Sequence, residues 1–388
     1  MTNRIYMDYH ATTPVDPRVL EVMLPYFTDR FGNAASTNHS LGWQAEKAVD
    51  HARSQVAKLI GAESVEITFT SGATESNNLA IAGVAERYRQ KGKHIITQAT
   101  EHSAVLDPLR KLERDGYDIT VLPVNEYGVI DLKELEKALR DDTILVSIMA
   151  ANNEVGALMP VSAIGKMCHE RGVLYHCDAV QACGRMPIDV QSQGIDLLSI
   201  SAHKFYGPKG VGALYARRKK PRVSLMPQML GGGHERGNRS GTLNVPGIVG
   251  MGEAANCILQ DLDEDILRLQ TLGSLLADKL RQGIPEAQVN GPLENRLPGN
   301  WNISIPGVGA EKLILAMRNL CISSGAACAS AQQGPSHVLK AMGLSDQRCH
   351  GSLRFGLGRF TTEKEVLSAA AQVASAVQQI RSSEAGTN

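Results

Sequence analysis

The sequence predicts an α/β protein with a large domain, built on a mainly parallel seven-stranded sheet, and a second, smaller α/β domain. Seven short β-branched runs lie between residues 65 and 216, most of them separated by stretches with helical spacing. Such alternation is typical of a parallel sheet covered by helices. From about residue 246 the pattern changes. A length of 388 residues also favours about two domains.

The seven predicted strands follow one another in the first part of the chain. They are VEITFT (65–70), KHIITQ (93–98), DITVLPV (118–124), TILVSIMA (143–150), GVLYHCDA (172–179), IDLLSISA (195–202) and GVGALYA (210–216). Helical spacing at 75–92 and 101–116 predicts two of the connecting helices. Because ligands bind beyond the carboxyl ends of parallel strands, polar motifs directly after these strands are candidate site residues.

The second part of the chain has longer helices and fewer strands. We expect helices over 246–283, 310–319 and 362–380, and strands over 300–305 and 352–358. We therefore assign residues 15–258 to the large domain, and residues 1–14 and 259–388 to the small domain.

Charge and cysteine content exclude several classes of protein. Lys and Arg together number 40, as do Asp and Glu, so we expect no direct nucleic-acid binding. No apolar run approaches the roughly 20 residues of a membrane helix, and the N-terminus lacks a signal-peptide core. Seven cysteines, an odd number without a CxxC pair, argue against a disulfide framework and a zinc site. We expect a cytoplasmic protein with no membrane contact.

Two motifs have the chemistry of a phosphate and ring-nitrogen site. SGATESNN (71–78) follows a strand and opens a helix, so its N–H groups and the Thr74 hydroxyl suit a phosphate; ordinary helix capping is the alternative. YHCDAVQ (175–181) ends a strand at Asp178. A buried carboxylate there needs a cation such as a protonated ring nitrogen, and Gln181 could reach the same ring; an N-cap role for Asp178 is the alternative.

Two further strand ends carry reactive side chains. SAHKFYGPKG (201–210) places Lys204 after a strand, where it is either solvated or able to form a Schiff base with an aldehyde. Ser201 and His203 flank it. TEHSAVLD (100–107) places His102 at a strand-to-helix turn, where its ring could stack on a ligand and move protons, although a lone histidine is more often structural.

Two loops complete the set of motifs. GGGHERGNRSGTLNV (231–245) contains Thr242 and is either a flexible surface loop or a loop that completes a phosphate site across a subunit interface. SSGAACASAQQG (323–334) holds Cys328 among small and polar residues. No bulky neighbour in this stretch could bury that thiol, whereas the other six cysteines are best interpreted as small buried hydrophobes.

Taken together, these motifs resemble the cysteine desulfurases of the NifS/IscS type, which are pyridoxal-phosphate enzymes of the class V aminotransferase family with the fold-type-I architecture. The resemblance extends from YMDYHATTPVDPRV (6–19) to RFGLGRFTTEKEV (354–366) and includes NNEVG at 152–156.

The resemblance implies a role for each candidate residue. Lys204 would hold pyridoxal 5'-phosphate through a Schiff base, His102 would stack on its ring, Asp178 would pair with the ring nitrogen, and Gln181 would donate to the ring oxygen. The implied phosphate ligands are Thr74, Ser201, His203 and, from the other subunit of a C2 homodimer, Thr242. Ala73 and Asn153 would also bind the cofactor, and Asn153 with Arg354 would hold the substrate carboxylate.

The implied reaction converts L-cysteine to L-alanine and leaves the sulfur on Cys328 as a persulfide. A sulfur-acceptor protein then receives it: an iron–sulfur scaffold, a tRNA-thiolation enzyme or the DNA phosphorothioation machinery. We expect no resident metal; an iron–sulfur cluster held transiently at Cys328, and the use of selenocysteine, are left open. A lyase of the same fold that needs no protein thiol is the alternative enzyme. A non-enzymatic sulfur carrier would have no use for Lys204, Asp178 and His102.

Three residues near Cys328 depart from the family pattern. Ala326 and Ala329 stand where Ser and Thr are usual, and Gly334 stands where Glu is common. The chain also has a shorter segment after its last helix than members that dock an iron–sulfur scaffold. These departures bear on acceptor choice and leave the chemical residues intact. The long loop after Cys328 resembles the NifS/IscS branch and not the branch with a shorter loop.

Overall fold

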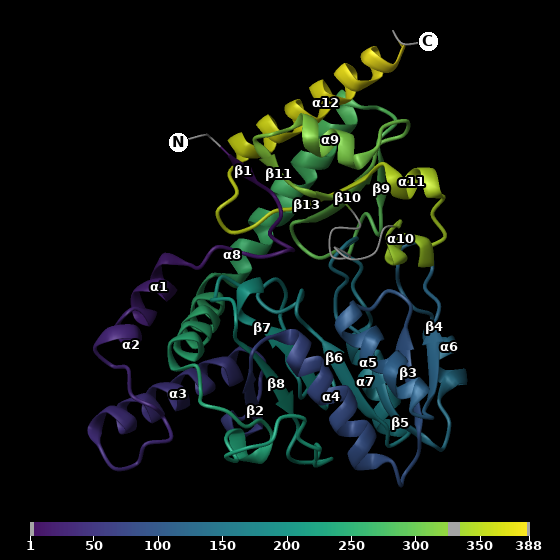
Figure 1. The fold of residues 1–388 in the computed structure, drawn as a ribbon. Helices are drawn as coiled ribbons and strands as arrows, with labels where there is room; N and C mark the ends of the chain where they lie inside the picture. The colour runs from purple at the N-terminus through teal and green to yellow at the C-terminus, as the bar shows by residue number, and fades with distance from the viewer. Residues whose placement is uncertain (1–3, 325–333, 386–388) are drawn as a thin grey trace.

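The computed structural model describes residues 4–324 and 334–385, and its larger part is built on a seven-stranded sheet (Figure 1). Each strand falls within a run predicted from the sequence, which confirms the fold class. The strands are β2 (Ile67–Thr70), β3 (His94–Gln98), β4 (Asp118–Leu122), β5 (Thr143–Ser147), β6 (Leu174–Asp178), β7 (Leu197–Ser201) and β8 (Gly212–Ala216).

The order of the strands brings six carboxyl ends to one edge of the sheet. The order is β2-β8-β7-β6-β5-β3-β4. Only β8 runs antiparallel to its neighbours, β2 and β7, so β2 is parallel to the remaining strands. The carboxyl ends of β2, β3, β4, β5, β6 and β7 therefore lie on the same side as the start of β8.

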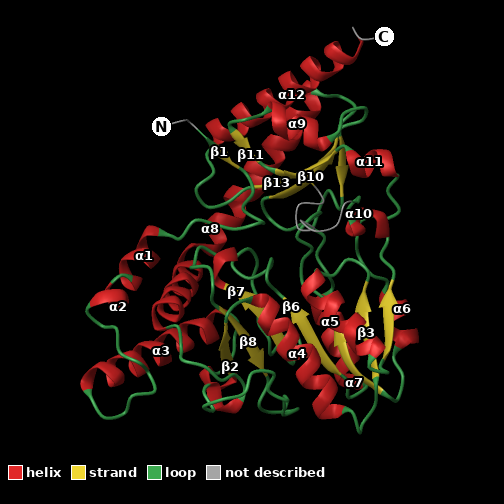
Figure 2. Ribbon diagram, in the orientation of Figure 1, coloured by secondary structure: helices red, strands yellow, loops and turns green. Residues whose placement is uncertain are grey.

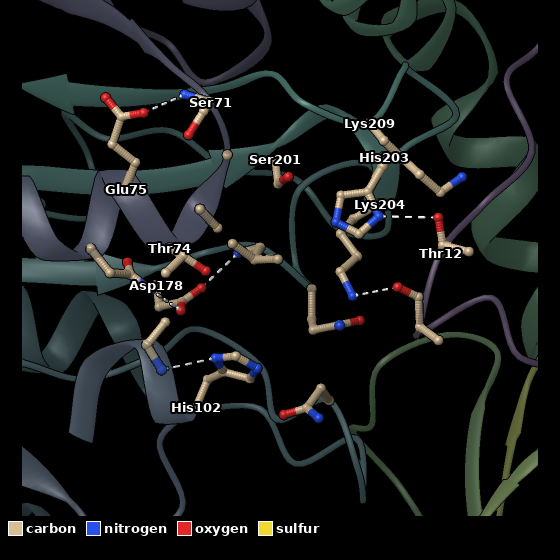
Figure 3. Close-up of a pocket in the computed structure, with 18 of the residues that line it drawn as sticks. Thr12, Ser71, Thr74, Glu75, His102, Asp178, Ser201, His203, Lys204 and Lys209 are labelled. Carbon is tan, nitrogen blue, oxygen red and sulfur yellow. Dashed lines mark hydrogen bonds between the residues drawn. The ribbon is translucent and has the colours of Figure 1, made fainter. Parts of the chain in front are cut away.

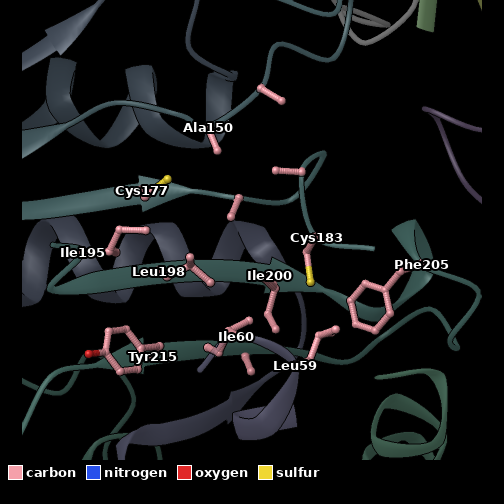
Figure 4. Packing of buried hydrophobic residues seen from close by; sticks show 14 of the residues in the cluster. Leu59, Ile60, Ala150, Cys177, Cys183, Ile195, Leu198, Ile200, Phe205 and Tyr215 are labelled. Atoms are coloured by element: carbon pink, nitrogen blue, oxygen red, sulfur yellow. The ribbon is translucent and has the colours of Figure 1, made fainter. Parts of the chain in front are cut away.

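Helices cover both faces of this sheet (Figure 2). On one face, α4 (Ala73–Tyr88) and α5 (Ser103–Arg114) pack in a cluster with Leu197. On the other face, α3 (Ser40–Leu59), α7 (Val161–Glu170) and the first part of α8 (Val245–Gly283) pack in a larger cluster with Leu198. Figure 4 shows Leu198 and Ile200 in this cluster with Leu59. Adjacent residues of one strand serve opposite faces because strand side chains alternate.

The smaller part contains a four-stranded antiparallel sheet with a core of its own. Its order is β12 (Ser323–Ser324), β13 (Ser352–Gly356), β10 (Asn300–Ser304) and β9 (Gln288–Asn290). Beside it, β1 (Ile5–Tyr6) pairs with β11 (Leu320–Cys321). Two helices, α9 (Ala310–Ala316) and α12 (Glu363–Ala385), lie over this part (Figure 1).

One long helix, α8, runs through both cores. Ile258 packs in the core of the large sheet, whereas Leu269 packs in the core of the small sheet. The proposed domain boundary between residues 258 and 259 lies inside this helix. Residues of α10 (His337–Ala341) pack in the large core although the sequence assigns them to the small domain, because this segment turns back toward the large sheet after β12.

The remaining helices are short and lie outside the predicted set. They are α1 (Pro17–Met23), α2 (Pro25–Thr28), α6 (Leu132–Ala138) and α11 (Asp346–His350). No helix in the described ranges is long and apolar enough to cross a membrane.

The glycine-rich loop at 231–244 is anchored by a buried ion pair. The Glu235 carboxylate accepts hydrogen bonds of 2.7 and 2.8 Å from the Arg53 guanidinium and one of 2.7 Å from the Phe69 N–H. The backbone at Glu235 and Arg236 has φ of 47° and 56°, a conformation that non-glycine residues rarely adopt. This anchoring contradicts the interpretation of the whole segment as a flexible surface loop.

Glu235→Gln tests this anchor. The substitution leaves the buried Arg53 guanidinium with the exposed Asp50 carboxylate, 3.8 Å from its Nε, as its remaining counter-charge, so we expect the free energy of unfolding to fall by about 3 kcal/mol in chemical denaturation. The control is Asp107→Asn, which breaks the solvent-exposed pair with Arg110 and should leave stability unchanged. Equal losses in both variants would contradict the anchoring role.

Candidate active site

The carboxyl edge of the large sheet opens into a cavity of about 590 Å³ (Figure 3). Nine of the residues singled out in the sequence line it: Ala73, Thr74, His102, Asn153, Asp178, Gln181, Ser201, His203 and Lys204. The first and the last of them, Ala73 and Lys204, are 131 positions apart in the sequence. The sheet topology brings them together because each follows a strand that ends at this edge.

One end of the cavity is suited to an anion. The N-cap of α4 is Gly72, whose backbone has φ 154° and supplies no side-chain cap, so the N-terminal N–H groups of a 16-residue helix lie at the cavity wall. A Cβ at Gly212 would lie 2.7 Å from the Gly72 Cα. Glycine at position 212 therefore lets the start of β8 approach this turn and bring Lys209 and Gly210 into the lining.

Basic side chains also line the cavity. The His203 Nδ1 lies 3.1 Å from the Thr12 hydroxyl oxygen. Burial lowers the pKa of His203 to about 4, and the neighbouring charges of Lys204 and Lys209 add to this effect, so the ring is neutral near neutral pH. A bound phosphate would be attracted by the two lysines and could accept a hydrogen bond from the neutral ring, so the cavity fits a phosphate.

Lys204 projects into the cavity from the 3-10 turn that follows β7 (Figure 3). Its Nζ donates hydrogen bonds of 2.7 Å to the His10 carbonyl and 2.8 Å to the Ala11 carbonyl. The N-terminal segment, far from Lys204 in sequence, therefore holds the amine in place.

Asp178 ends β6 and is 7% exposed. Its Oδ2 accepts a 2.8 Å hydrogen bond from the Asn77 amide, and its Oδ1 accepts one of 3.0 Å from the Val180 N–H. These two donors fix the orientation of the Asp178 carboxylate at the cavity wall, where it suits a cationic ring nitrogen as partner.

Glu101 is a buried acid beside this site that the sequence analysis missed, although it lies in the TEHSAVLD motif. Its Oε1 accepts hydrogen bonds from the Met149 N–H (2.7 Å) and the Gln98 amide (2.8 Å). Complete burial, aided by the negative charge of Asp178, raises the pKa of Glu101 to about 8. Near neutral pH the Glu101 carboxyl is therefore protonated and adds no second negative charge next to Asp178.

His102 is the N-cap of α5, and its imidazole borders the cavity. The Nδ1 atom accepts a 3.1 Å hydrogen bond from the Ala104 N–H. This contact fixes the ring against the helix start at the wall of the cavity.

Three predicted residues lie elsewhere. Arg354 on β13 is 1% exposed and outside the cavity lining, and its Nη2 lies 2.9 Å from the Asp8 Oδ1. Thr242 lines a separate cavity of about 80 Å³ that shares Ser71 and Gly210 with the larger one. Cys328 lies outside the described residues, as do Ala326 and Ala329, whereas Gly334 is exposed.

Sequence comparisons identify the family to which this site belongs. The model of the family described as aminotransferase class-V matches residues 5–368. The chain belongs to the class-V aminotransferase family. A protein named cysteine desulfurase IscS, from Anaeromyxobacter dehalogenans (strain 2CP-C), is 58% identical over 93% of this chain and 89% of that protein. The family resemblance predicted from the sequence is thereby confirmed.

Solved structures agree with the family assignment. A NifS-like protein superposes with a TM-score of 0.90 at 38% identity, covering 97% of this chain and 99% of that one. A structure described as SspA in complex with cysteine gives a TM-score of 0.78 at 35% identity, covering 92% of this chain and 99% of that one.

Pyridoxal phosphate is the cofactor of this family, and the cavity residues fit it. The uncapped start of α4 and the cluster of cationic groups suit its phosphate, the Asp178 carboxylate suits its ring nitrogen, and the Lys204 amine suits its aldehyde. When bound, the cofactor supplies an electron sink for charge that develops at the substrate Cα.

Glu101→Gln tests the protonated state of the buried acid. An acid whose pKa is raised on folding stabilises the native state most at low pH, and this stability is lost between the unfolded value near 4.5 and the folded value near 8. We expect the melting temperature of the wild type to fall between pH 6 and pH 9 relative to that of the variant, whose amide cannot ionise. Parallel curves would show that Glu101 is ionised in the native protein.

Proposed function

We propose that this cysteine desulfurase removes the sulfur of L-cysteine in the cavity described above and transfers it through Cys328 to an acceptor protein. The observation that carries the proposal is the convergence of Lys204, His102 and Asp178 on one cavity in a chain 58% identical to a cysteine desulfurase. The relative described in complex with cysteine supports L-cysteine as the ligand.

Each cavity residue has a proposed role that follows from its position. Thr74, Ser201 and His203 would hold the phosphate of the cofactor, and Asp178 would pair with its ring nitrogen. The Lys204 amine would act as the base that takes the proton from the substrate Cα. The His102 ring would stack on the cofactor and could carry a second proton.

The substrate carboxylate is assigned to Arg354 and Asn153. The Arg354 Nη2 pairs with Asp8, and its Nη1 lies 3.4 Å from the Asn153 carbonyl oxygen. In this structure the Asp8 carboxylate therefore accepts the hydrogen bond of the Arg354 guanidinium. A substrate carboxylate would replace Asp8 and accept hydrogen bonds from the same planar group.

The sulfur step uses Cys328. The Cys328 thiolate attacks the substrate sulfur, an S–S bond forms, and the Cβ–S bond breaks with its electron pair moving to carbon. Protonation of the carbon fragment gives L-alanine, so L-cysteine and a thiol become L-alanine and a persulfide. The segment that carries Cys328 begins after β12, where Ser323 pairs directly with Arg354, which supports access of the thiol to the substrate.

The proposed acceptor is a protein, with an iron–sulfur scaffold as the first candidate because the relative cited above carries the name IscS.

We also propose a cytoplasmic location. The cysteines at 168, 177, 183, 257, 321 and 349 are free thiols, which is typical of a reducing compartment.

A homodimer is proposed on the basis of exposed apolar side chains. Leu24, Phe27 and Phe31, from the α1–α2 region, are 55%, 60% and 66% exposed, and Leu230 is 82% exposed. Large apolar side chains on a surface favour association.

The loop that bears Thr242 is held to α4 by a hydrogen bond from Arg239 to Glu75, which limits the movement of Thr242.

The chemistry is tested by following alanine release from L-cysteine in the wild type, Lys204→Ala and Cys328→Ala, with persulfide scored by mass spectrometry. We expect Lys204→Ala to lose turnover and visible absorbance together. Cys328→Ala should keep the absorbance and lose at least 99% of alanine formation, because it lacks the nucleophile. Undiminished alanine release by Cys328→Ala would favour the alternative, a lyase that needs no protein thiol.

The cross-subunit role of Thr242 is tested by mixing two inactive variants. A mixed dimer has one Lys204→Ala subunit and one Thr242→Asp subunit. Its site with an intact Lys204 receives an intact Thr242 from the partner subunit, so one of its two sites is active. Random pairing makes half of the dimers mixed, so we expect roughly a quarter of the wild-type activity. Lys204→Ala alone is the control. No recovery in the mixture would mean that Thr242 serves the site of its own chain.

A further inference from the structure

The N-terminal segment places a buried histidine, His10, directly behind the cavity wall. His10 is 0% exposed and does not line the cavity, whereas its neighbours Ala11 and Thr12 do. Its Nδ1 lies 2.9 Å from the Gln181 Oε1. Its carbonyl oxygen accepts hydrogen bonds from the Gln181 Nε2 at 3.0 Å and from the Lys204 Nζ at 2.7 Å. His10 therefore contacts two of the residues assigned to the cofactor.

These contacts determine which way the Gln181 amide points. A backbone carbonyl can only accept a hydrogen bond, so the Gln181 nitrogen must face the His10 carbonyl and the Gln181 oxygen must face the His10 ring. The His10 Nδ1 must then carry the hydrogen and donate it to the Gln181 Oε1. The other ring nitrogen, Nε2, has no partner with good hydrogen-bond geometry among the described residues, although the Gly299 backbone also interacts with the ring.

The surroundings of His10 keep the ring neutral. Complete burial lowers its pKa well below the usual range, and the charges of Arg185 and Arg354 lower it further. A neutral imidazole has one hydrogen, and the contact with Gln181 uses it. The ring thus acts as a donor to Gln181 near neutral pH.

We propose that His10 is a positioning residue that makes Gln181 a hydrogen-bond donor toward the cofactor. The Gln181 Nε2 carries two hydrogens; one is bonded to the His10 carbonyl, and the other remains for the cavity that Gln181 lines. Without the His10 Nδ1–H the Gln181 Oε1 loses its donor, and the His10 carbonyl becomes the one remaining contact that holds the amide in this orientation, so the amide is less firmly prevented from presenting its oxygen. An oxygen would repel the negatively charged ring oxygen of pyridoxal phosphate, whereas an N–H stabilises it. This inference rests on the proposed function of Gln181.

The test compares His10→Asn with His10→Phe in the cofactor-loaded protein. Asn offers an amide N–H in place of the Nδ1–H, whereas Phe keeps the ring volume and removes the donor. The readout is the pH midpoint at which the visible absorbance changes. We expect His10→Phe to raise this midpoint by about one unit, the effect of one lost hydrogen bond to a charged group, because the ring oxygen loses the donor that stabilises its charge. His10→Asn should retain most of the wild-type midpoint.

Two controls separate positioning from packing. His94 is also buried, bonds Thr143 and Thr120 and lies outside the cavity lining, so His94→Phe should lower stability without moving the midpoint. In a Gln181→Ala background, His10→Phe should cause no further shift, because His10 acts through Gln181.

The outcomes are distinguishable. A pure packing role predicts that Phe preserves the midpoint as well as Asn does, which would overturn the inference. A shift from His10→Phe that persists without Gln181 would also overturn it. A wild-type protein that binds no pyridoxal phosphate and has no visible absorbance would instead overturn the proposed function.

Discussion

The structure depends on one topological constraint: the carboxyl ends of six parallel strands lie at a single edge of the large sheet. The antiparallel strand β8, inserted between β2 and β7, preserves this arrangement because two reversals restore the direction of β2. Side chains from motifs far apart in the sequence, such as Thr74 and Ser201, therefore line the same cavity. Helices on both faces hold the sheet, so that the edge is a stable platform for short loops.

Charge is separated along that platform. Lys204 and Lys209 supply positive charge to the cavity beside the neutral His203, whereas Asp178 supplies negative charge with Asn77 and the Val180 N–H as donors. The Glu75 carboxylate also lines the cavity and is paired with Arg239. Protonation of Glu101, a consequence of its burial, keeps a second negative charge away from Asp178. This separation suits a ligand with an anionic phosphate at one end and a cationic ring nitrogen elsewhere, and it is present in the protein before any ligand binds.

The N-terminal segment connects this platform to the smaller sheet. Residues 8–12 run from the Asp8 contact with Arg354 on β13 to the carbonyls of His10 and Ala11 that hold the Lys204 amine. The residues assigned to the substrate carboxylate and to the cofactor are thus joined by four residues of backbone. Through this short backbone segment, a change in the contact between Arg354 and Asp8 can alter the position of the Lys204 amine.

The sequence by itself determined the fold class, the seven strands of the large sheet and nine cavity residues, because strand and helix periodicity and strand-end polar motifs are local signals. Only the tertiary structure revealed the roles of His10, Asn77 and Glu101. Their partners lie 171, 101 and 48 positions away in sequence, and a polar residue acquires its role only when burial removes water and supplies a specific neighbour. The anchoring of the 231–244 loop by Glu235 has the same origin, since its partner Arg53 lies 182 positions away.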